Sequence, residues 1–263
     1  MPRAPAVPGL RRVVVSAPFG NYVQPAGTTP TMGTFTLARR RGRVGAILRT
    51  VRPYPKLGAW VNRIGLRNPG IAWLEGRAAR GRGLADKLVS VHGFDDGEWA
   101  ELVDRGAALE PLGLELNMSC PNVAHQEPPA GLFQRAAACG VPVVVKLPPL
   151  RFRPMAEAAL DAGLRAFHCC NTLPVKGGGM SGRPLMPLSL EAIEKLRALP
   201  GGDALTLIGG GGIQDAADLD GYAAAGADHF ALGTVLMSPL VLLTHARVKP
   251  FLEKADALTS RTP

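Results

Sequence analysis

The sequence predicts a single α/β domain folded as a closed (β/α)8 barrel, the TIM-barrel fold. The chain has 263 residues, a length that one such barrel commonly reaches. Short apolar, β-branched runs alternate with longer segments of helical period, which is typical of parallel strands joined by helices. No linker or change of composition divides residues 1–263, and no GxGxxG follows the first strand, as an open dinucleotide-binding sheet would require.

Eight runs fit the strands of this barrel because they are short, apolar and bounded by turn residues. They are residues 12–17, 44–48, 88–92, 112–117, 141–147, 166–170, 204–208 and 228–232. Helical segments are expected near 31–40, 70–80, 95–108, 131–139, 154–162, 189–199, 215–225 and 239–257. Eight strands alternating with eight helices is the count of a closed parallel barrel, so we expect functional residues where the strands end.

The four cysteines, Cys120, Cys139, Cys169 and Cys170, show no CxxC spacing. This argues against a structural zinc site or an iron–sulfur cluster, and we expect no bound metal. The adjacent pair falls in a predicted strand and is interpreted as free core thiols, which suits a reduced, cytoplasmic protein. Since the sequence has neither the apolar core of a secretory signal nor a run of membrane-spanning length, we expect no membrane association.

The charge is unevenly distributed along the chain. Residues 1–85 carry 15 Lys or Arg and a single acidic residue, Glu75, whereas the remainder carries 15 basic and 20 acidic residues. Such a field can steer anionic ligands or bind nucleic acid. We interpret it mainly as a solvated, anion-steering face and not as a nucleic-acid site.

Glycine-rich stretches end the last two predicted strands. Residues 208–213 read IGGGGI and residues 231–234 read ALGT. Glycine allows backbone N–H groups to approach an anion closely, and the N-terminus of a following helix adds partial positive charge. The loops after the seventh and eighth strands are the usual phosphate site of this fold, so we expect a phosphate-bearing cofactor or substrate there. Glycines that only form tight turns are the alternative.

Polar residues follow the fourth, fifth and sixth predicted strands. Asn117, Cys120 and Asn122 place two amides around a thiol, and amides suit a ring that carries both donors and acceptors. Lys146 follows three valines, so it should point into the barrel or cap its mouth, where burial implies an anionic companion. Residues 171–172 end the sixth strand and precede a polar, glycine-rich loop.

Together these strand ends resemble the dihydroorotate dehydrogenase family. The stretch ELNMSCPN at 115–122 is similar to the loop that carries the catalytic base of that family. The resemblance extends from about residue 13 to residue 237. Its other motifs are, in order, NRIGLRNPG at 62–70, VKLPP at 145–149, NT at 171–172, GGMSGRPL at 178–185, IGGGGI at 208–213 and ALGT at 231–234. Each motif alone is moderately specific, and their common order makes the combination strong.

The resemblance implies an enzyme that binds FMN in the barrel and oxidises dihydroorotate to orotate in pyrimidine biosynthesis. Cys120 would be the general base that removes a proton from C5 of the substrate while hydride leaves C6 for the flavin. A cysteine at this position indicates the soluble class of the family. The substrate would be bound by Asn62, Gly65, Leu66, Asn117, Asn122, Asn171 and Thr172.

The resemblance also implies the contacts of the cofactor. Lys146 would lie beside the flavin ring and stabilise the negative charge of its reduced form. The other FMN contacts would be Ala17, Gly182, Gly211, Gly212, Gly233 and Thr234. The family usually has a lysine in a T-K-S/T stretch after the second strand; here the matching stretch is 48–50, so Arg49 would take the place of that lysine.

Other readings stay open at this point. The tRNA dihydrouridine synthases also have FMN barrels with a cysteine after an N-M-x-C-P sequence, and their basic surface binds tRNA. A paralogue that acts on another cyclic amide, or binds flavin with weak activity, is a further alternative. We expect a homodimer. The electron acceptor would be fumarate, NAD through an electron-transfer partner subunit, or another compound.

Overall fold

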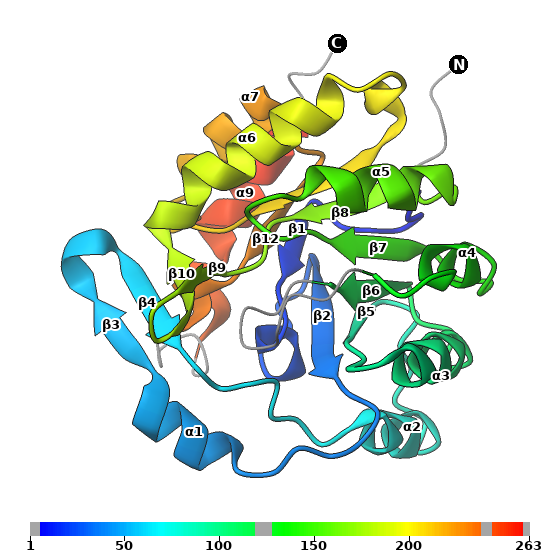
Figure 1. The fold of residues 1–263 in the computed structure, drawn as a ribbon. Coiled ribbons are helices and arrows are strands. Elements are labelled where there is room, and N and C mark those ends of the chain that lie inside the picture. The colour runs from blue at the N-terminus through cyan, green and yellow to red at the C-terminus, as the bar shows by residue number, and fades with distance from the viewer. Residues whose placement is uncertain (1–5, 119–127, 238–243, 260–263) are drawn as a thin grey trace.

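The chain folds as a parallel barrel surrounded by helices (Figure 1). The computed structural model describes residues 6–118, 128–237 and 244–259. Within these ranges, eight parallel strands close in the order β1-β12-β11-β8-β7-β6-β5-β2, which confirms the predicted fold. The strands are β1 (Val13–Val15), β2 (Thr28–Phe35), β5 (Leu88–Val91), β6 (Gly113–Asn117), β7 (Val143–Lys146), β8 (Ala166–Cys169), β11 (Thr206–Gly210) and β12 (His229–Leu232).

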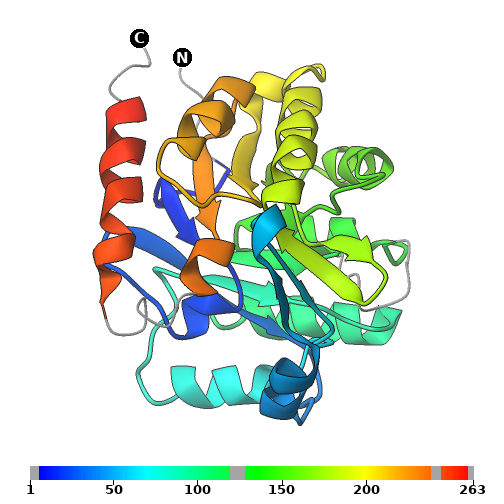
Figure 2. The same ribbon diagram turned by 90° about the vertical axis from the view of Figure 1, so that its left-hand side faces the viewer.

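Helices connect the strands and cover the outside of the barrel (Figures 1 and 2). They include α2 (Ile71–Ala78), α3 (Asp96–Ala107), α4 (Leu132–Ala137), α5 (Arg153–Asp161), α6 (Met186–Arg197), α7 (Asp218–Ala225) and α9 (Lys249–Thr259). Helix α9 packs against α7 and β1, and so lies where the first and last strands meet. Among the described helices, none is long and apolar enough to cross a membrane.

The predicted second strand and the helix before it are wrong, whereas the other seven strands are confirmed with ends shifted by at most two residues. The segment predicted as helix 31–40 contributes instead to β2, and the segment predicted as strand 44–48 lies in helix α1 (Arg43–Thr50). Strand β2 holds four β-branched threonines, but its third residue is Pro30, a residue type that strands seldom contain, and it lacks a continuous apolar run. The large apolar side chains of α1 are exposed and spaced as on one helical face; they are Val44, Ile47 and Leu48.

A second sheet, not predicted from the sequence, stands at the mouth of the barrel. In the described part of the chain its order is β3-β4-β10-β9, and its strand pairs are antiparallel. The strands are β3 (Arg52–Tyr54), β4 (Ala59–Asn62), β9 (Leu173–Val175) and β10 (Gly178–Gly182). Asn62 pairs with Gly179, so the segments after β2 and after β8 lie side by side (Figure 2). A Cβ on Gly178 would lie 2.0 Å from the Asn62 carbonyl oxygen, so this approach requires glycine.

The interior of the barrel changes from apolar to polar along the strands. A buried apolar cluster fills one end and consists of Val7, Val14, Leu88, Val144, Ala166, Ile208 and Ala231. Side chains alternate between the two faces of a strand, so the next inward positions on β5, β7 and β8 are Ser90, Lys146 and His168. These three side chains are also buried. A polar layer therefore lies directly above a closed apolar floor.

Asn68 joins the segments that follow β2 and β4. Its amide oxygen accepts hydrogen bonds from the backbone N–H groups of Thr36 at 3.2 Å and Gly70 at 2.8 Å. Its amide nitrogen donates to the Thr36 hydroxyl at 2.9 Å and to the Leu66 carbonyl at 2.6 Å. Leu66 has a φ of 53°, a left-handed conformation that leucine rarely adopts. The buried Asn68 side chain therefore holds this loop in place.

We predict that Asn68→Ala lowers the free energy of unfolding by about 2 kcal/mol or more, because buried backbone groups lose their hydrogen-bond partners. Urea denaturation followed by circular dichroism measures the change. The matched control is Gln134→Ala, which removes an exposed amide from α4 and should change stability by less than about 0.5 kcal/mol. Equal losses in the two variants would contradict the role assigned to Asn68.

Candidate active site

A cavity of about 490 Å³ opens where the barrel strands end. Its volume lies within the range of small-molecule sites. The wall is built from the ends of β1, β2, β6, β7 and β8, the loops after β11 and β12, and the second sheet. Residues from widely separated parts of the chain thus meet in one space, at the end of the barrel where this fold carries its chemistry.

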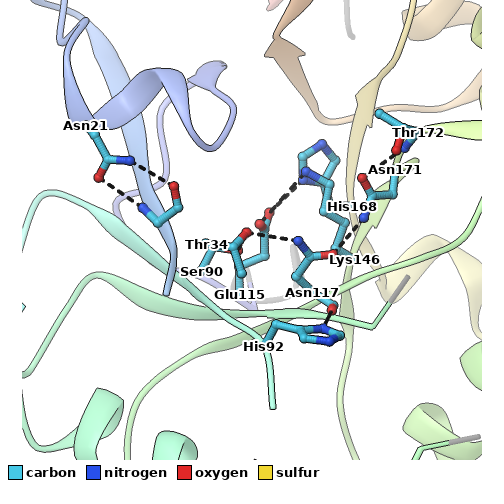
Figure 3. Close-up of polar contacts among 11 residues, drawn as sticks. Asn21, Thr34, Ser90, His92, Glu115, Asn117, Lys146, His168, Asn171 and Thr172 are labelled. Atoms are coloured by element: carbon cyan, nitrogen blue, oxygen red, sulfur yellow. Dashed lines mark hydrogen bonds and ion pairs between the residues drawn. The ribbon is translucent and has the colours of Figure 1, made fainter. Parts of the chain in front are cut away.

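Three charged or titratable groups meet at the bottom of the cavity (Figure 3). The Glu115 carboxylate is fully buried: Oε2 lies 2.7 Å from Nδ1 of His168, and Oε1 lies 3.9 Å from Nζ of Lys146. Burial alone would raise the pKa of the Glu115 carboxyl group, but Lys146 and His168 together hold this pKa below its usual range. Lys146 and Glu115 therefore form a buried ion pair, the anionic companion that burial of the lysine requires.

Amide side chains are linked along the cavity wall by hydrogen bonds (Figure 3). Asn117 donates from Nδ2 to Thr34 Oγ1 at 2.9 Å, and Asn171 donates from Nδ2 to Asn117 Oδ1 at 2.6 Å. Oδ1 of Asn171 accepts from the backbone N–H of Thr172 at 2.8 Å. Thr34 and Ser90 share a further hydrogen bond of 2.9 Å. Because each member is held by the next, the two amides keep fixed orientations in the cavity wall.

The loops after β11 and β12 bring bare backbone to the cavity. Gly211 and Gly212 have φ values of 98° and 88°, which favour glycine. A Cβ on Gly212 would lie 3.0 Å from the carbonyl oxygen of Gly182, and one on Gly211 would lie 3.1 Å from the Cβ of Leu185. Gly233 also lines this part of the wall. Backbone N–H groups that no side chain covers are suited to bind an anion such as phosphate.

Basic and aromatic side chains form the rim of the cavity. The Arg43 guanidinium lies over the Tyr22 ring at 5.1 Å from its centroid, and that of Arg77 lies over Trp73 at 5.0 Å. Arg67 also lines the cavity. All of these residues belong to the basic first third of the chain, whose positive field would attract an anionic ligand towards the opening.

The structure brings most of the predicted site residues together. Those that line the cavity are Ala17, Asn62, Gly65, Leu66, Asn117, Lys146, Asn171, Thr172, Gly211, Gly212, Gly233 and Thr234. Gly182 borders it through its contact with Gly212. Cys120 and Asn122 lie outside the described residues.

Arg49 is not brought to the cavity. It is exposed on helix α1 and is not among the described residues of the cavity wall. Its assignment depended on a strand at 44–48, and the second barrel strand is β2 instead. The residues at the end of β2 that line the cavity are Gly33, Thr34 and Phe35, so an uncharged segment stands where a cationic contact was expected.

Three functional positions were missed by sequence reasoning: Thr34, Glu115 and His168. Thr34 was placed in a helix, so its inward position could not be recognised. Glu115 and His168 are polar residues inside apolar strands. Glu115 stands two residues before Asn117, and His168 stands two residues before Cys170, and both of these later residues line the cavity. This period of two was the available signal, because it places both residues on the inner face of the barrel.

Comparison with known proteins agrees with this arrangement. A family model described as dihydroorotate dehydrogenase matches residues 26–245. The chain belongs to the dihydroorotate dehydrogenase family. The catalytic subunit of dihydroorotate dehydrogenase B (NAD(+)) from Latilactobacillus sakei is 30% identical, with 80% of this chain and 83% of that protein covered. Dihydroorotate dehydrogenase A (fumarate) from Limosilactobacillus reuteri is also 30% identical, with coverage of 71% and 73%.

Solved structures support the same fold. DHODH from Eimeria tenella in complex with ferulenol superposes with a TM-score of 0.75 at 17% identity, covering 98% of this chain and 86% of that chain. The match to the family model begins just before β2 and ends after β12, so it includes every described strand of the barrel except β1. This family member therefore has the barrel of its relatives and a cavity at the expected end.

We predict that Glu115→Gln lowers the free energy of unfolding at pH 7 by about 3 kcal/mol, because the buried ion pair between Glu115 and Lys146 is broken. The pKa of Glu115 is depressed in the folded protein, so its contribution is fully present above its ordinary value of 4.5 and is lost as the pH falls below it. The difference between wild type and variant should therefore shrink in acid. Denaturation at several pH values measures it.

Glu191→Gln is the matched control, since Glu191 forms an exposed pair with Lys195 on α6. It should change stability by less than about 0.5 kcal/mol. A Glu115→Gln deficit that stays constant between pH 7 and about pH 3 would show that the buried carboxylate is not the titrating group.

Proposed function

We propose that this chain oxidises dihydroorotate to orotate with FMN bound in the cavity. The observation that carries the proposal is the composition of one wall: fixed amides from β6 and β8 stand beside the Lys146–Glu115 pair, and a glycine cradle lies in the same space. Amides suit a cyclic imide such as the dihydropyrimidine ring, and the cradle suits a phosphate. The family membership of the chain supports the same reaction.

The described residues fit FMN. Gly211 and Gly212 leave a backbone cradle that a Cβ would fill, and the Gly233–Thr234 segment borders it. Lys146 would lie beside the flavin ring and stabilise negative charge on it. When bound, FMN would supply the hydride acceptor, a chemistry that no side chain offers. Ala17 would contact the ring system from the end of β1.

The substrate would bind through the amide wall. Asn117 and Asn171 are held by each other and by Thr34, so they present donors and acceptors to a ring with little loss of entropy. Asn62 and Thr172 extend the same wall. Cys120 follows Asn117 by three residues and would accept the proton from C5 of dihydroorotate. A free thiol is mostly protonated at neutral pH, so hydrogen-bond donors and the positive charge of Lys146 would favour the thiolate.

The cofactor test is direct. Purified protein, reconstituted if colourless, should release one FMN per chain on heating, as measured by chromatography of the supernatant. Anaerobic addition of dihydroorotate to the loaded protein should bleach the flavin absorption. We expect the glycine cradle to hold one phosphate, so release of FAD, or failure to bind FMN at all, would refute the proposal.

We predict that Cys120→Ala folds and binds FMN but is reduced by dihydroorotate about 10²-fold more slowly or worse, because a general base is lost. Cys120→Ser should retain part of the rate with its pH profile displaced upward, since a hydroxyl is a weaker acid than a thiol. Stopped-flow bleaching across pH measures both. Cys139→Ala is the matched control, because Cys139 lies after α4 with its thiol 3.7 Å from the Val141 carbonyl and should leave the rate unchanged. A wild-type rate in Cys120→Ala would remove the thiol from the mechanism.

A further inference from the structure

His168 lies at the bottom of the cavity, and the proposed reaction gives it no role. It is an inward residue of β8, between the apolar residues Phe167 and Cys169. Its side chain is only 2% exposed, and its ring contributes to the cavity wall. An imidazole in such a place costs desolvation unless its hydrogen bonds are satisfied, so its environment defines what it can do.

The hydrogen bond to Glu115 decides which ring nitrogen carries the proton. Ionised Glu115 can only accept, so the 2.7 Å contact places the hydrogen on Nδ1 of His168. Burial, followed by the charge of Lys146, lowers the pKa of the His168 ring, so the imidazole is neutral at pH 7. Nε2 therefore carries a lone pair and no hydrogen.

Nε2 is the ring nitrogen that Glu115 does not contact. Figure 3 shows this atom on the far side of the ring from Glu115. It faces Gly210 at the end of β11, where a Cβ would lie only 3.3 Å away. A side chain at position 210 would therefore crowd Nε2, and His168 itself lines the cavity. The next two residues, Gly211 and Gly212, line the cavity.

The groups that face His168 come from four neighbouring elements. β6 contributes Glu115 and β7 contributes Lys146, which carry opposite charges. β11 and β12 contribute Gly210 and Ala231, which cannot titrate. The thiol of Cys170, which follows β8, stays protonated because burial raises its pKa to about 12. Among the described residues here, His168 is thus the group with an available basic atom, and a negative charge added nearby would raise its lowered pKa.

We propose that His168 is the proton-accepting residue of the cavity: when the ring bound there gains negative charge on reduction, Nε2 of His168 takes up a proton from solvent. The proposal rests on the FMN binding proposed above. Two electrons and one proton enter the flavin, and a second proton forms an N–H bond at Nε2. No covalent bond of the protein breaks, and the electrons come from dihydroorotate or from an added reductant.

Charge balance makes this coupling favourable. With oxidised flavin, the Lys146–Glu115 pair and a neutral imidazole leave the bottom of the cavity without net charge. Reduction adds one negative charge in a dry space, where attraction to a nearby proton is much stronger than in water. Protonated His168 keeps its hydrogen bond to Glu115 and carries a positive charge. It therefore compensates the added negative charge without a change of conformation.

The test is the reduction potential of the FMN-loaded protein as a function of pH, measured with a redox dye under anaerobic conditions. His168→Gln keeps a donor for Glu115 and cannot ionise. Between about pH 6 and pH 8 the potential of the wild type should fall about twice as steeply with pH as that of His168→Gln, because one more proton accompanies each electron pair. His229→Gln is the matched control. His229 lies on β12, its ring contacts the Arg11 carbonyl, and it is absent from the described cavity wall, so the potential of this variant should fall with pH as steeply as that of the wild type.

Each result decides something different. Equal slopes in wild type and His168→Gln, with FMN bound to both, would overturn the role of His168 and leave the proposed function standing. Protein that binds no FMN would overturn both. Should His168→Gln fail to fold, His168→Asn offers a shorter amide donor for the same comparison. In addition, ¹⁵N NMR of histidine-labelled wild type should show one Nε2 becoming protonated on reduction, and five unchanged rings would refute the proposal.

Discussion

The Glu115 carboxylate lies inside the barrel with no exposed surface, and its charge must be balanced by its neighbours. Lys146 from β7 supplies the opposite charge, and His168 from β8 supplies a hydrogen bond, from the two strands that follow in the barrel order. The carboxylate in turn offers an opposite charge to the buried ammonium group of Lys146. Removing either residue would break a buried ion pair on the cavity floor. The electrostatics of the whole site depend on this one pair.

The polar layer has clear boundaries. Below it, the apolar cluster around Val14, Val144 and Ile208 closes the barrel to water. Above it, hydrogen-bonded amides and glycine backbone line the cavity. The second sheet then forms a wall on one side, because β4 and β10 pair across the opening. A ligand in the cavity is thus held between a neutralised floor and walls taken from distant parts of the chain.

Much of this could be predicted from sequence, because barrel strands and the residues that end them have local signals. Glycine at 209–212, the amides after β6 and β8 and the lysine of β7 stood where the fold requires its site. Strand β2 was missed because it contains Pro30 and four threonines and has no apolar run. That error also placed the expected cationic contact with the cofactor at Arg49. The second sheet could not be foreseen as one sheet, because the pairing of β4 with β10, which unites its two local strand pairs, joins segments more than 100 residues apart.

Closure of the barrel has a consequence for the life of the chain in the cell. Strand β1 pairs with β12, in a register that sets Val13 against Phe230. During synthesis, every residue from β1 to β12 must leave the ribosome before this edge of β1 finds its partner. Until then the nascent sheet exposes a row of unpaired backbone groups, a risk for aggregation. Gly233 reaches its place near Ser16 only when β1 and β12 pair, so this part of the cavity wall is completed after the amide wall. A ligand that contacts this part of the wall would therefore stabilise completed barrels and not partial ones.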